Sequence, residues 1–404
     1  CRRGEGKVTG MSRPGARQPT VQESEIARRL IVLGPTTRSA LSEQLGLSYS
    51  STSRATQGLV AAGVVTETST GATTAGRPTM RLSLVPQARR VIGVVLHEQA
   101  ITAVSANLSG TIVRQHNVTG LPAGTTAEQI VERVAGVVHE LRADLSELDA
   151  VCVSVGGKVT DRATIARAAY WDWPADFPLG QTLQDRVGVP VSVCNDVYAI
   201  CQAQAWYGVG RLDPSFGMVT IGQGLGFGSV VNGVVAERLD DGHLLCHAPT
   251  GGHRECRLGH RGCAAASLER DNLTVTVAGR PHPATFASVA EAISTGYLRG
   301  VGRVDDPGEP AAIMDDASAA AGHLVASLAG ALQTRTIVVA GMDAPLVCAK
   351  GSRFWDVLAD RQRVGVFDHP NPEIEIHFAG QAYDDWALGA AAVAMHQSLG
   401  WTFD

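Results

Sequence analysis

Val219-Thr220-Ile221-Gly222-Gln223-Gly224-Leu225-Gly226-Phe227-Gly228 is the most informative segment of this 404-residue chain for its fold. An apolar, β-branched run enters a glycine-rich turn, and glycine then alternates with larger residues. Alternation with a period of two predicts a second strand that pairs with the first. A single hairpin of this kind occurs in many folds, so its meaning depends on the sequence around it.

Six further segments surround this hairpin, and most of them are apolar runs that end in glycine or polar residues. They lie at residues 91–95, 107–113, 151–157, 191–196, 337–341 and 388–392. Short runs rich in Val and Ile are typical of strands buried on both faces, as in α/β proteins. The Ala- and Gly-rich run at 388–392 predicts the start of the final helix. An aromatic content of only 5% also favours an α/β body over a β-sandwich.

Taken in this order and spacing, these segments resemble the ROK family, which contains bacterial sugar kinases and the xylose and N-acetylglucosamine repressors. The resemblance covers the body, residues 87–404. It implies a two-lobed, actin-like sugar-kinase fold whose final helix returns to the first lobe. It also implies a sugar or sugar-derivative effector and a homodimer or homotetramer.

The first 86 residues predict a separate domain. Residues 1–20 are basic and lack apolar periodicity, which predicts a disordered tail. Over residues 21–86 the pattern predicts three helices followed by two short strands, at residues 21–33, 37–45, 48–62, 64–67 and 80–84. Gly34-Pro35 and Gly46 separate the helices, and Thr36 or Thr37 and then Ser48 are the expected N-caps. This order is that of a winged helix-turn-helix.

Charge separates the same two regions. Residues 1–90 carry 13 basic and 5 acidic residues, a net charge of +8, whereas residues 91–404 carry 21 and 34, a net charge of −13. A basic head on an acidic body predicts contact with a polyanion. The alternatives are a basic tail without a partner and a small helical domain with a polar surface.

DNA is the expected polyanion, because the third helix would present polar side chains to a major groove. We expect base or phosphate contacts from Ser50, Thr52, Ser53, Arg54 and Gln57. Arg77 lies between Gly76 and Pro78 in the predicted wing. An arginine held at that point is suited to a narrow minor groove.

The body lacks the residues that phosphoryl transfer needs in kinases of this fold. Their first strand leads into an Asp-x-Gly-x-Thr turn, which organises the metal and cradles phosphate. This chain has Leu96-His97-Glu98-Gln99-Ala100 there, without Asp, Gly or Thr. We therefore predict no kinase activity. The alternative is a sugar kinase with an accessory DNA-binding head.

The resemblance implies a sugar site that is only partly preserved. Asn195-Asp196 matches the family's sugar-contacting pair, and Gly157 matches a turn where backbone approaches the sugar. The alternative for the pair is an ordinary helix N-cap. Asp240 and His243 match the family's Glu-x-Gly-His, with Asp one methylene shorter than Glu. A further family glutamate falls at Ala265, so a regulator that binds no sugar, or that responds to a protein, stays open.

A metal site is also implied by the resemblance. The family carries Cys-x-Cys-Gly-x-x-Gly-Cys with an upstream His, and this chain has Cys256-Arg257-Leu258-Gly259-His260-Arg261-Gly262-Cys263. Zinc needs four ligands, and His243, Cys256 and Cys263 carry over, while Leu258 replaces the middle cysteine. The candidates for a fourth ligand are Cys246, His247, His253 and His260. Loss of the metal is the alternative.

No apolar run approaches the roughly 20 residues of a membrane helix. Residues 1–20 also lack the apolar core of a signal peptide, so we expect a cytoplasmic protein with its eight cysteines as thiols or metal ligands. Together these features predict a transcription regulator that binds operator DNA and senses a sugar.

Overall fold

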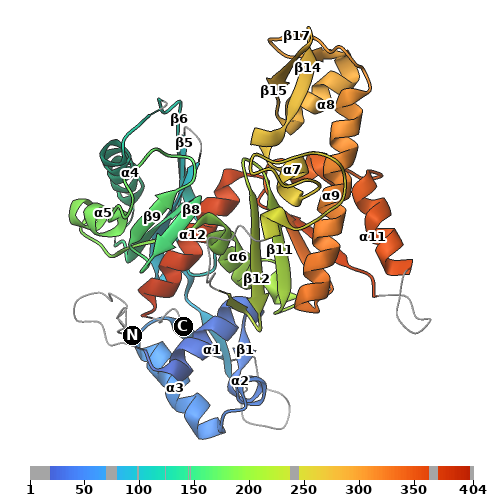
Figure 1. The fold of residues 1–404 in the computed structure, drawn as a ribbon. Coiled ribbons are helices and arrows are strands. Elements are labelled where there is room, and N and C mark those ends of the chain that lie inside the picture. Colours follow the sequence, from blue (N-terminus) through green and yellow to red (C-terminus); the bar gives the residue numbers. More distant parts are fainter. Residues whose placement is uncertain are drawn as a thin grey trace, which may run out of the picture. The chain divides into compact units, whose positions relative to one another are not determined.

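The computed structural model describes residues 19–69, 80–97, 100–122, 124–143, 145, 147–236, 245–363 and 372–400. The chain divides into two compact units, Cys1–Leu212 with Tyr383–Asp404, and Asp213–Ala382. Figure 1 labels their helices and strands. Among the described residues, none of the helices has the length and apolar composition needed to cross a bilayer.

The head, in the first unit, contains the three predicted helices and the two predicted strands, an order consistent with a helix-turn-helix regulator. Its helices and strands are α1 (Val21–Leu33), β1 (Thr36–Thr37), α2 (Arg38–Leu45), α3 (Tyr49–Ala61), β2 (Val65–Ser69) and β3 (Met80–Leu84). The strands pair in the order β1-β3-β2. Thr37 and Ser48 are the caps of α2 and α3, because their side chains accept from the backbone N–H groups of Ala40 and Ser51. The pattern missed β1, since two residues show no periodicity.

The first lobe, also in this unit, is a five-stranded sheet with helices on both faces. Its strands, in the sheet order β10-β7-β4-β5-β6, are Val191–Asn195, Ala150–Val155, Arg90–His97, Ala100–Asn107 and Ile112–Thr119. One face packs on α4 (Ala127–Arg142) and α5 (Leu179–Val187), through alternate apolar residues such as Ile92, Val94 and Val153. A separate hairpin, β8 (Gly157–Thr160) with β9 (Thr164–Ala168), follows β7.

The other face packs on α6 (Asp196–Tyr207) and α12 (Tyr383–Ser398). Small residues allow this contact, since a Cβ at Gly93 would lie 2.0 Å from the carbonyl oxygen of Ala387 on α12. A Cβ at Gly389 would lie 2.5 Å from the carbonyl oxygen of Ala199 on α6. The Ala- and Gly-rich run in the last helix is therefore its packing surface. The helix begins at Tyr383, five residues before the predicted start at residue 388.

The second unit is another α/β lobe. Its sheet has the order β13-β12-β11-β18-β19, with strands Val234–Val235, Leu225–Val231, Phe216–Ile221, Thr336–Ala340 and Glu375–Ala379. The glycine-rich stretch forms the antiparallel β11–β12 hairpin, as predicted. Four helices accompany the sheet, namely α7 (Ala264–Leu268), α9 (Glu309–Leu332), α10 (Ala344–Val347) and α11 (Arg353–Arg363).

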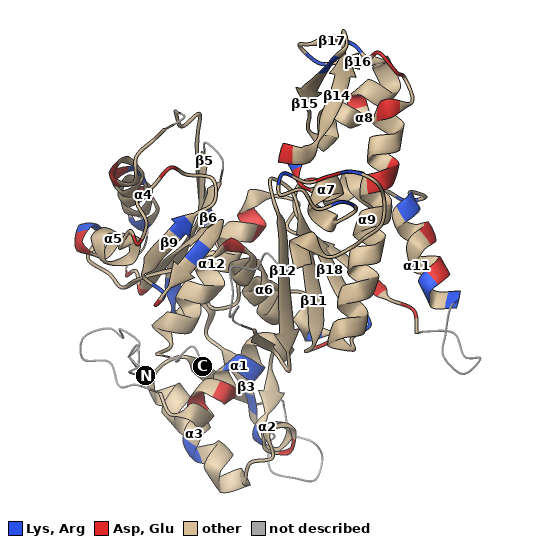
Figure 2. Ribbon diagram, viewed as in Figure 1, with Lys and Arg blue, Asp and Glu red and all other residues tan. Residues whose placement is uncertain are grey.

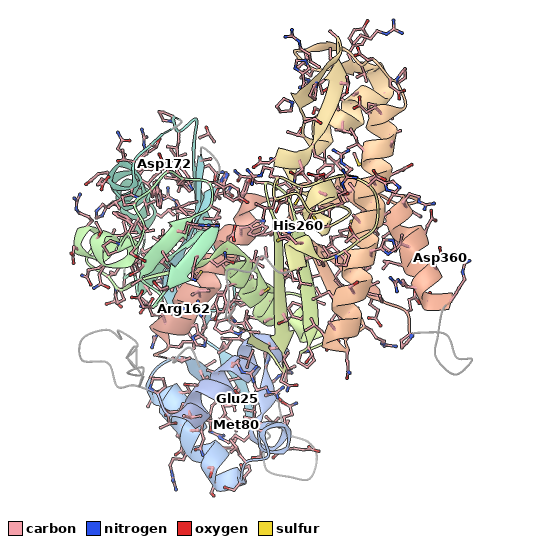
Figure 3. All side chains as sticks on the ribbon, in the orientation of Figure 1. Glu25, Met80, Arg162, Asp172, His260 and Asp360 are labelled. Atoms are coloured by element: carbon pink, nitrogen blue, oxygen red, sulfur yellow. The ribbon has the colours of Figure 1, made fainter. Side chains whose placement is uncertain are left out.

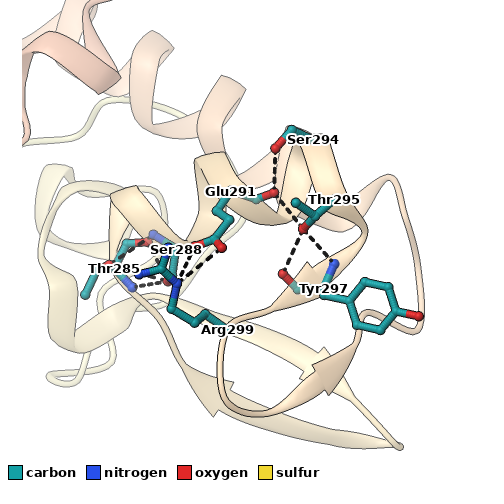
Figure 4. Close-up of polar contacts among 7 residues, drawn as sticks. All are labelled: Thr285, Ser288, Glu291, Ser294, Thr295, Tyr297 and Arg299. Atoms are coloured by element: carbon teal, nitrogen blue, oxygen red, sulfur yellow. Dashed lines mark hydrogen bonds and ion pairs between the residues drawn. The ribbon is translucent and has the colours of Figure 1, made fainter.

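Between α7 and α9 the chain adds a small structure that the sequence patterns did not indicate. It consists of β14 (Thr274–Val277), β15 (Arg280–Pro283), α8 (Phe286–Thr295), β16 (Tyr297–Leu298) and β17 (Gly302–Arg303). Figure 4 shows its polar contacts. Thr285 and Ser288 form the capping box of α8, and the Arg299 guanidinium lies 2.9 Å from the Glu291 carboxylate. These bonds hold the β16–β17 hairpin against the helix.

Candidate functional site

Helix α3 presents one polar face to solvent. Ser50, Arg54 and Gln57 are exposed and Ser53 is half-buried. Their spacing of three and four residues places them on the same side of a helix. Hydroxyl, guanidinium and amide groups on one face of the second helix of a helix-turn-helix are suited to a DNA groove.

Thr52 does not belong to this face, which corrects the prediction that it contacts DNA. Its side chain is fully buried, and its hydroxyl accepts a hydrogen bond from Ser42 on α2 at 3.0 Å. Thr56 is buried as well and accepts from the Arg38 guanidinium at 2.9 Å, while Arg38 also pairs with Glu67 on β2. These bonds fix α3 relative to α2 and to the sheet. The hydroxyl pattern alone did not separate the inner positions from the outer ones.

The wing arginine predicted to enter a minor groove, Arg77, lies outside the described residues. Figure 2 shows basic residues of the head on α1 and α3. The arginine-rich composition of the first 90 residues is therefore distributed over the folded head as well as over the tail that precedes it.

The predicted effector residues of the first lobe gather where β7 and β10 end. Asp196 is the first residue of α6, and one carboxylate oxygen accepts from the N–H of Val197 at 2.8 Å. The other oxygen lies 3.4 Å from the point where Gly156 would carry a Cβ, and the Tyr170 ring lies 2.8 Å from that point. A half-buried carboxylate beside an aromatic ring and bare backbone is suited to sugar hydroxyls.

Asn195 holds this arrangement together. Its Oδ1 accepts from the N–H groups of Val197 and Tyr198, which caps α6, and its Nδ2 donates to the carbonyl of Gly157 at 3.0 Å. Asn195 is therefore the N-cap of α6, as the alternative interpretation of the Asn195-Asp196 pair had it. The packing of the β8–β9 hairpin also requires glycine at position 157, since a Cβ there would lie 2.2 Å from the carbonyl oxygen of Arg167. Asp196 therefore has the strongest geometry for an effector contact.

Arg162 and Tyr198 lie next to this region. The Arg162 guanidinium is 4.0 Å from the centre of the Tyr198 ring, a cation–π contact. Arg162 adopts a φ of 57°, a left-handed conformation that few residues other than glycine adopt. Figure 3 labels Arg162 in the first unit. No sequence pattern indicates Arg162, because its neighbour Tyr198 comes from another element.

His97 occupies the end of β4, where the kinases of this fold turn around phosphate. Its ring stacks on Tyr383 with centroids 3.5 Å apart and planes 11° apart, and its Nε2 lies 3.1 Å from the Thr102 hydroxyl. Burial lowers the pKa of His97 to about 4, so the ring is neutral at pH 7. The described end of β4 thus carries a stacked aromatic pair, while Glu98 and Gln99 lie outside the described residues.

In the second unit, His247, Cys256, His260 and Cys263 bring four ligand atoms within 4.8 Å of one another. The Cys256 sulfur lies 3.8 Å from Nδ1 of both His247 and His260, and the Cys263 sulfur lies 3.7 Å from Nδ1 of His247. In a tetrahedral zinc site the sulfur and nitrogen ligands are about 3.5 Å apart. The four groups can hold a metal ion. Figure 3 labels His260 in this loop.

Local turns position these ligands. The N–H of Gly259 donates to the carbonyl of Cys256, and the N–H of Cys256 donates to the carbonyl of His260, which closes a tight loop. Cys263 then begins α7 as its N-cap residue. Burial raises the pKa of Cys256, but hydrogen bonds from the backbone N–H groups of Leu258 and His260 and with the Cys263 side chain lower it, and the net shift of the pKa is downward. A lowered pKa favours the thiolate that metals bind.

Among the described residues, four donors meet at the cysteine loop. His243 and Asp240 lie outside the described residues, so His243 as a ligand stays a prediction. Of the four candidates for the remaining ligand, His247 and His260 join the cluster, while Cys246 bonds the Leu225 carbonyl instead. The sequence signal for His247 was present but weaker than the Gly-His dipeptide at residue 243.

The two positions where this chain departs from the family's polar residues, Leu258 and Ala265, differ in their exposure to solvent. The Leu258 side chain, which stands where the family has its middle cysteine, is 70% exposed. Ala265, which stands where the family has a glutamate, is fully buried in α7. Neither residue can supply the polar group that it replaces. His260, two residues further along the chain, lies in the cluster and could take the place of that cysteine.

The chain is similar in sequence to bacterial sugar kinases and to sugar-related repressors. The chain is 32% identical to a glucokinase of Streptomyces coelicolor over 179 residues, which is 43% of this chain and 54% of the glucokinase. It is 22% identical to the xylose repressor of Bacillus spizizenii over 252 residues, or 60% of this chain and 64% of the repressor. The alignments thus span about half to two thirds of these curated relatives.

Two solved structures share the fold. A ROK family transcriptional regulator described as a homolog of the E. coli MLC protein superposes with a TM-score of 0.68 at 16% identity, covering 94% of this chain and 97% of its own. A ROK family glucokinase from Streptomyces griseus, in complex with glucose and AMPPNP, gives 0.57 at 23% identity, covering 76% and 99%. The family model described as "ROK family" matches residues 91–345, more than half of the chain. The chain therefore belongs to the ROK family.

Proposed function

We propose that this protein is a DNA-binding transcription regulator whose ROK body binds a sugar or a related metabolite and does not transfer phosphate. The observation that carries the proposal is the head. Its helix α3 offers Ser50, Ser53, Arg54 and Gln57 on one open face, and the head region has a net positive charge. The repressors among its relatives agree with this function.

For the effector site, we propose that Asp196 bonds sugar hydroxyls. Asn195 and Gly157 position it, and Asp240 and His243 stay proposed contacts. The absence of phosphoryl transfer is proposed because His97 and Tyr383 stack where a phosphate turn would be needed. Because a glucokinase is among the relatives, the absence of phosphoryl transfer is tested by measuring sugar-dependent ATP hydrolysis.

We further propose that the metal is zinc, held by His247, Cys256, His260 and Cys263. Two thiolates and two imidazoles form a common structural zinc set, and zinc so bound stabilises the fold of the loop before α7. We also propose a homodimer or homotetramer, because paired heads match the two-fold symmetry of operators.

The test combines DNA binding, calorimetry and catalysis on the full chain. Genome-wide binding identifies an operator, and release is then measured with D-glucose, D-xylose and N-acetylglucosamine, free and phosphorylated. We expect specific binding, sugar-dependent release, and no sugar-dependent ATP hydrolysis. If the chain binds no specific DNA site, the proposed regulatory function is wrong. If no sugar gives heat in calorimetry, a regulator that senses a protein, or that has no effector, is favoured. Sugar-dependent ATP hydrolysis would favour the alternative, a sugar kinase with an accessory DNA-binding head.

A further inference from the structure

We propose that Arg211 fastens the DNA-binding head to the first lobe, so that the head follows the movement that an effector imposes on that lobe. The effector part rests on the proposed function. The attachment itself rests on contacts between described residues of the first unit.

Helix α6 connects the two regions. Its first residue is Asp196, the proposed effector contact, and its 12 residues span roughly 18 Å at about 1.5 Å per residue. The 3-10 turn Val209–Arg211 follows it directly, and both the helix and this turn lie against α1 of the head. Helix α6 and the turn that follows it thus connect the proposed sugar carboxylate with the first helix of the head.

Arg211 makes the bond at the head end. Its Nε donates to the carbonyl of Trp206 in α6 at 3.2 Å, and its Nη2 donates to the carbonyl of Ile31 in α1 at 3.3 Å. Ile31 is among the last four residues of α1, whose carbonyls lack partners within the helix. The last turn of α1 contains no basic residue of its own. Arg211 supplies both the donor and the positive charge that this helix end favours.

The lobe side of this bond is firmly packed. Trp206 is 1% exposed, and its ring centre lies 5.8 Å from that of His396 on α12. The hydroxyl of Tyr207 donates to the carbonyl of Leu108 at 3.5 Å, and a Cβ at Gly110 would lie 2.7 Å from the Tyr207 ring. The planar guanidinium of Arg211 therefore bonds the head from a fixed platform.

A second attachment runs through the covalent linker. The carbonyl of Pro86 accepts from the N–H of Leu108 at 2.9 Å, and the Arg89 guanidinium donates to the carbonyl of Ser398 at 3.3 Å. A linker alone leaves the head free to rotate about it. The Arg211–Ile31 bond, together with the packing of α1 on α6, restrains that rotation. Because α1 packs on α3, this bond sets the direction of the side proposed to face DNA.

Distance measurement tests the attachment without any effector. Spin labels on encoded keto amino acids are placed at Val60 of α3 and Val113 of β6, which are 37% and 57% exposed. Double electron–electron resonance should give one narrow distance in the parent chain. Arg211→Ala should broaden it, and so should Arg211→Lys, because one ammonium replaces a two-donor fork. Arg280→Ala, an exposed arginine of the other unit, is the matched control and should leave it narrow.

Operator binding tests the consequence. The affinity for operator is measured with and without the sugar that releases it, among D-glucose, D-xylose and N-acetylglucosamine. Arg211→Ala should reduce the ratio of the two affinities by at least about threefold, while calorimetry shows an unchanged sugar affinity. A narrow distance distribution in Arg211→Ala, or an unchanged ratio, would overturn the proposal. If no sugar acts, the proposed function loses its effector, while the distance distribution still decides the attachment.

Discussion

Thr52 and Arg54, two positions apart in α3, have different environments, and single substitutions can separate their roles. Arg54 is exposed on the side of α3 that is proposed to contact DNA, so Arg54→Ala should weaken operator binding by about 10- to 100-fold, the value of a lost base contact, with thermal stability unchanged. Thr52→Val should instead lower the free energy of unfolding by about 1 kcal/mol, through loss of the bond to Ser42. Mobility-shift titration and thermal denaturation measure the two effects. Equal effects of both variants on DNA affinity would contradict the assignment.

His260 is the residue on which the altered metal cluster depends. His260→Ala should lower zinc affinity by about tenfold or more, whereas His260→Cys should retain the metal, because both side chains are zinc ligands. His253→Ala is the control, since this exposed histidine is outside the cluster. Zinc content after dialysis against a competing chelator gives the readout. Equal zinc in the alanine variant and the parent would show that His260 is no ligand.

The buried imidazole of His97 makes stability depend on pH. Its pKa is about 4 in the folded chain against 6.5 when exposed, so between these values the unfolded chain binds more protons. Stability from this group is present above pH 6.5 and is lost as the pH falls towards 4. His97→Phe keeps a ring against Tyr383 but cannot titrate, so its melting temperature should fall less between pH 7 and 4.5 than that of the parent. Parallel pH profiles would contradict this.

At the scale of elements, the contact between β4 and α12 depends on the absence of a side chain. Gly93→Ala would place a Cβ 2.0 Å from the Ala387 carbonyl oxygen, so we expect destabilisation of about 1–3 kcal/mol or more. Gly136→Ala is the matched change, because Gly136 lies in α4 with no atom within 4 Å of a Cβ. It should raise stability by about 0.5–1 kcal/mol. Denaturant titration measures both, and equal midpoints would refute the packing argument.

The elements also differ in how well their sequences predicted them. The buried strands and the three head helices follow from apolar periodicity and from caps such as Thr37 and Ser48. The structure around α8 carries shorter patterns, since β16 and β17 have two residues each. Such short strands depend on side-chain bonds like that of Arg299 to Glu291, which join distant positions.

At the scale of the whole molecule, the separated charges predict salt-dependent DNA binding. The first 90 residues have a net charge of +8, and each phosphate contact releases a counterion. Operator affinity should therefore fall by about a thousandfold between about 50 and 200 mM salt if six or more phosphates are contacted. Fluorescence anisotropy over a salt series gives the slope. An affinity independent of salt would contradict a polyanion interface.

Sequence patterns were sufficient to predict the order of the main buried strands and of the three head helices, and the family of the body, because apolar periodicity, caps and glycine turns act over a few residues. They also located the cysteine loop and the Asn195-Asp196 pair. Only the tertiary structure decided which side chains meet. It buried Thr52, used Asn195 as a helix cap, and brought His247 and His260 to Cys256 and Cys263. Such choices depend on burial and distance between segments, which a linear pattern does not contain.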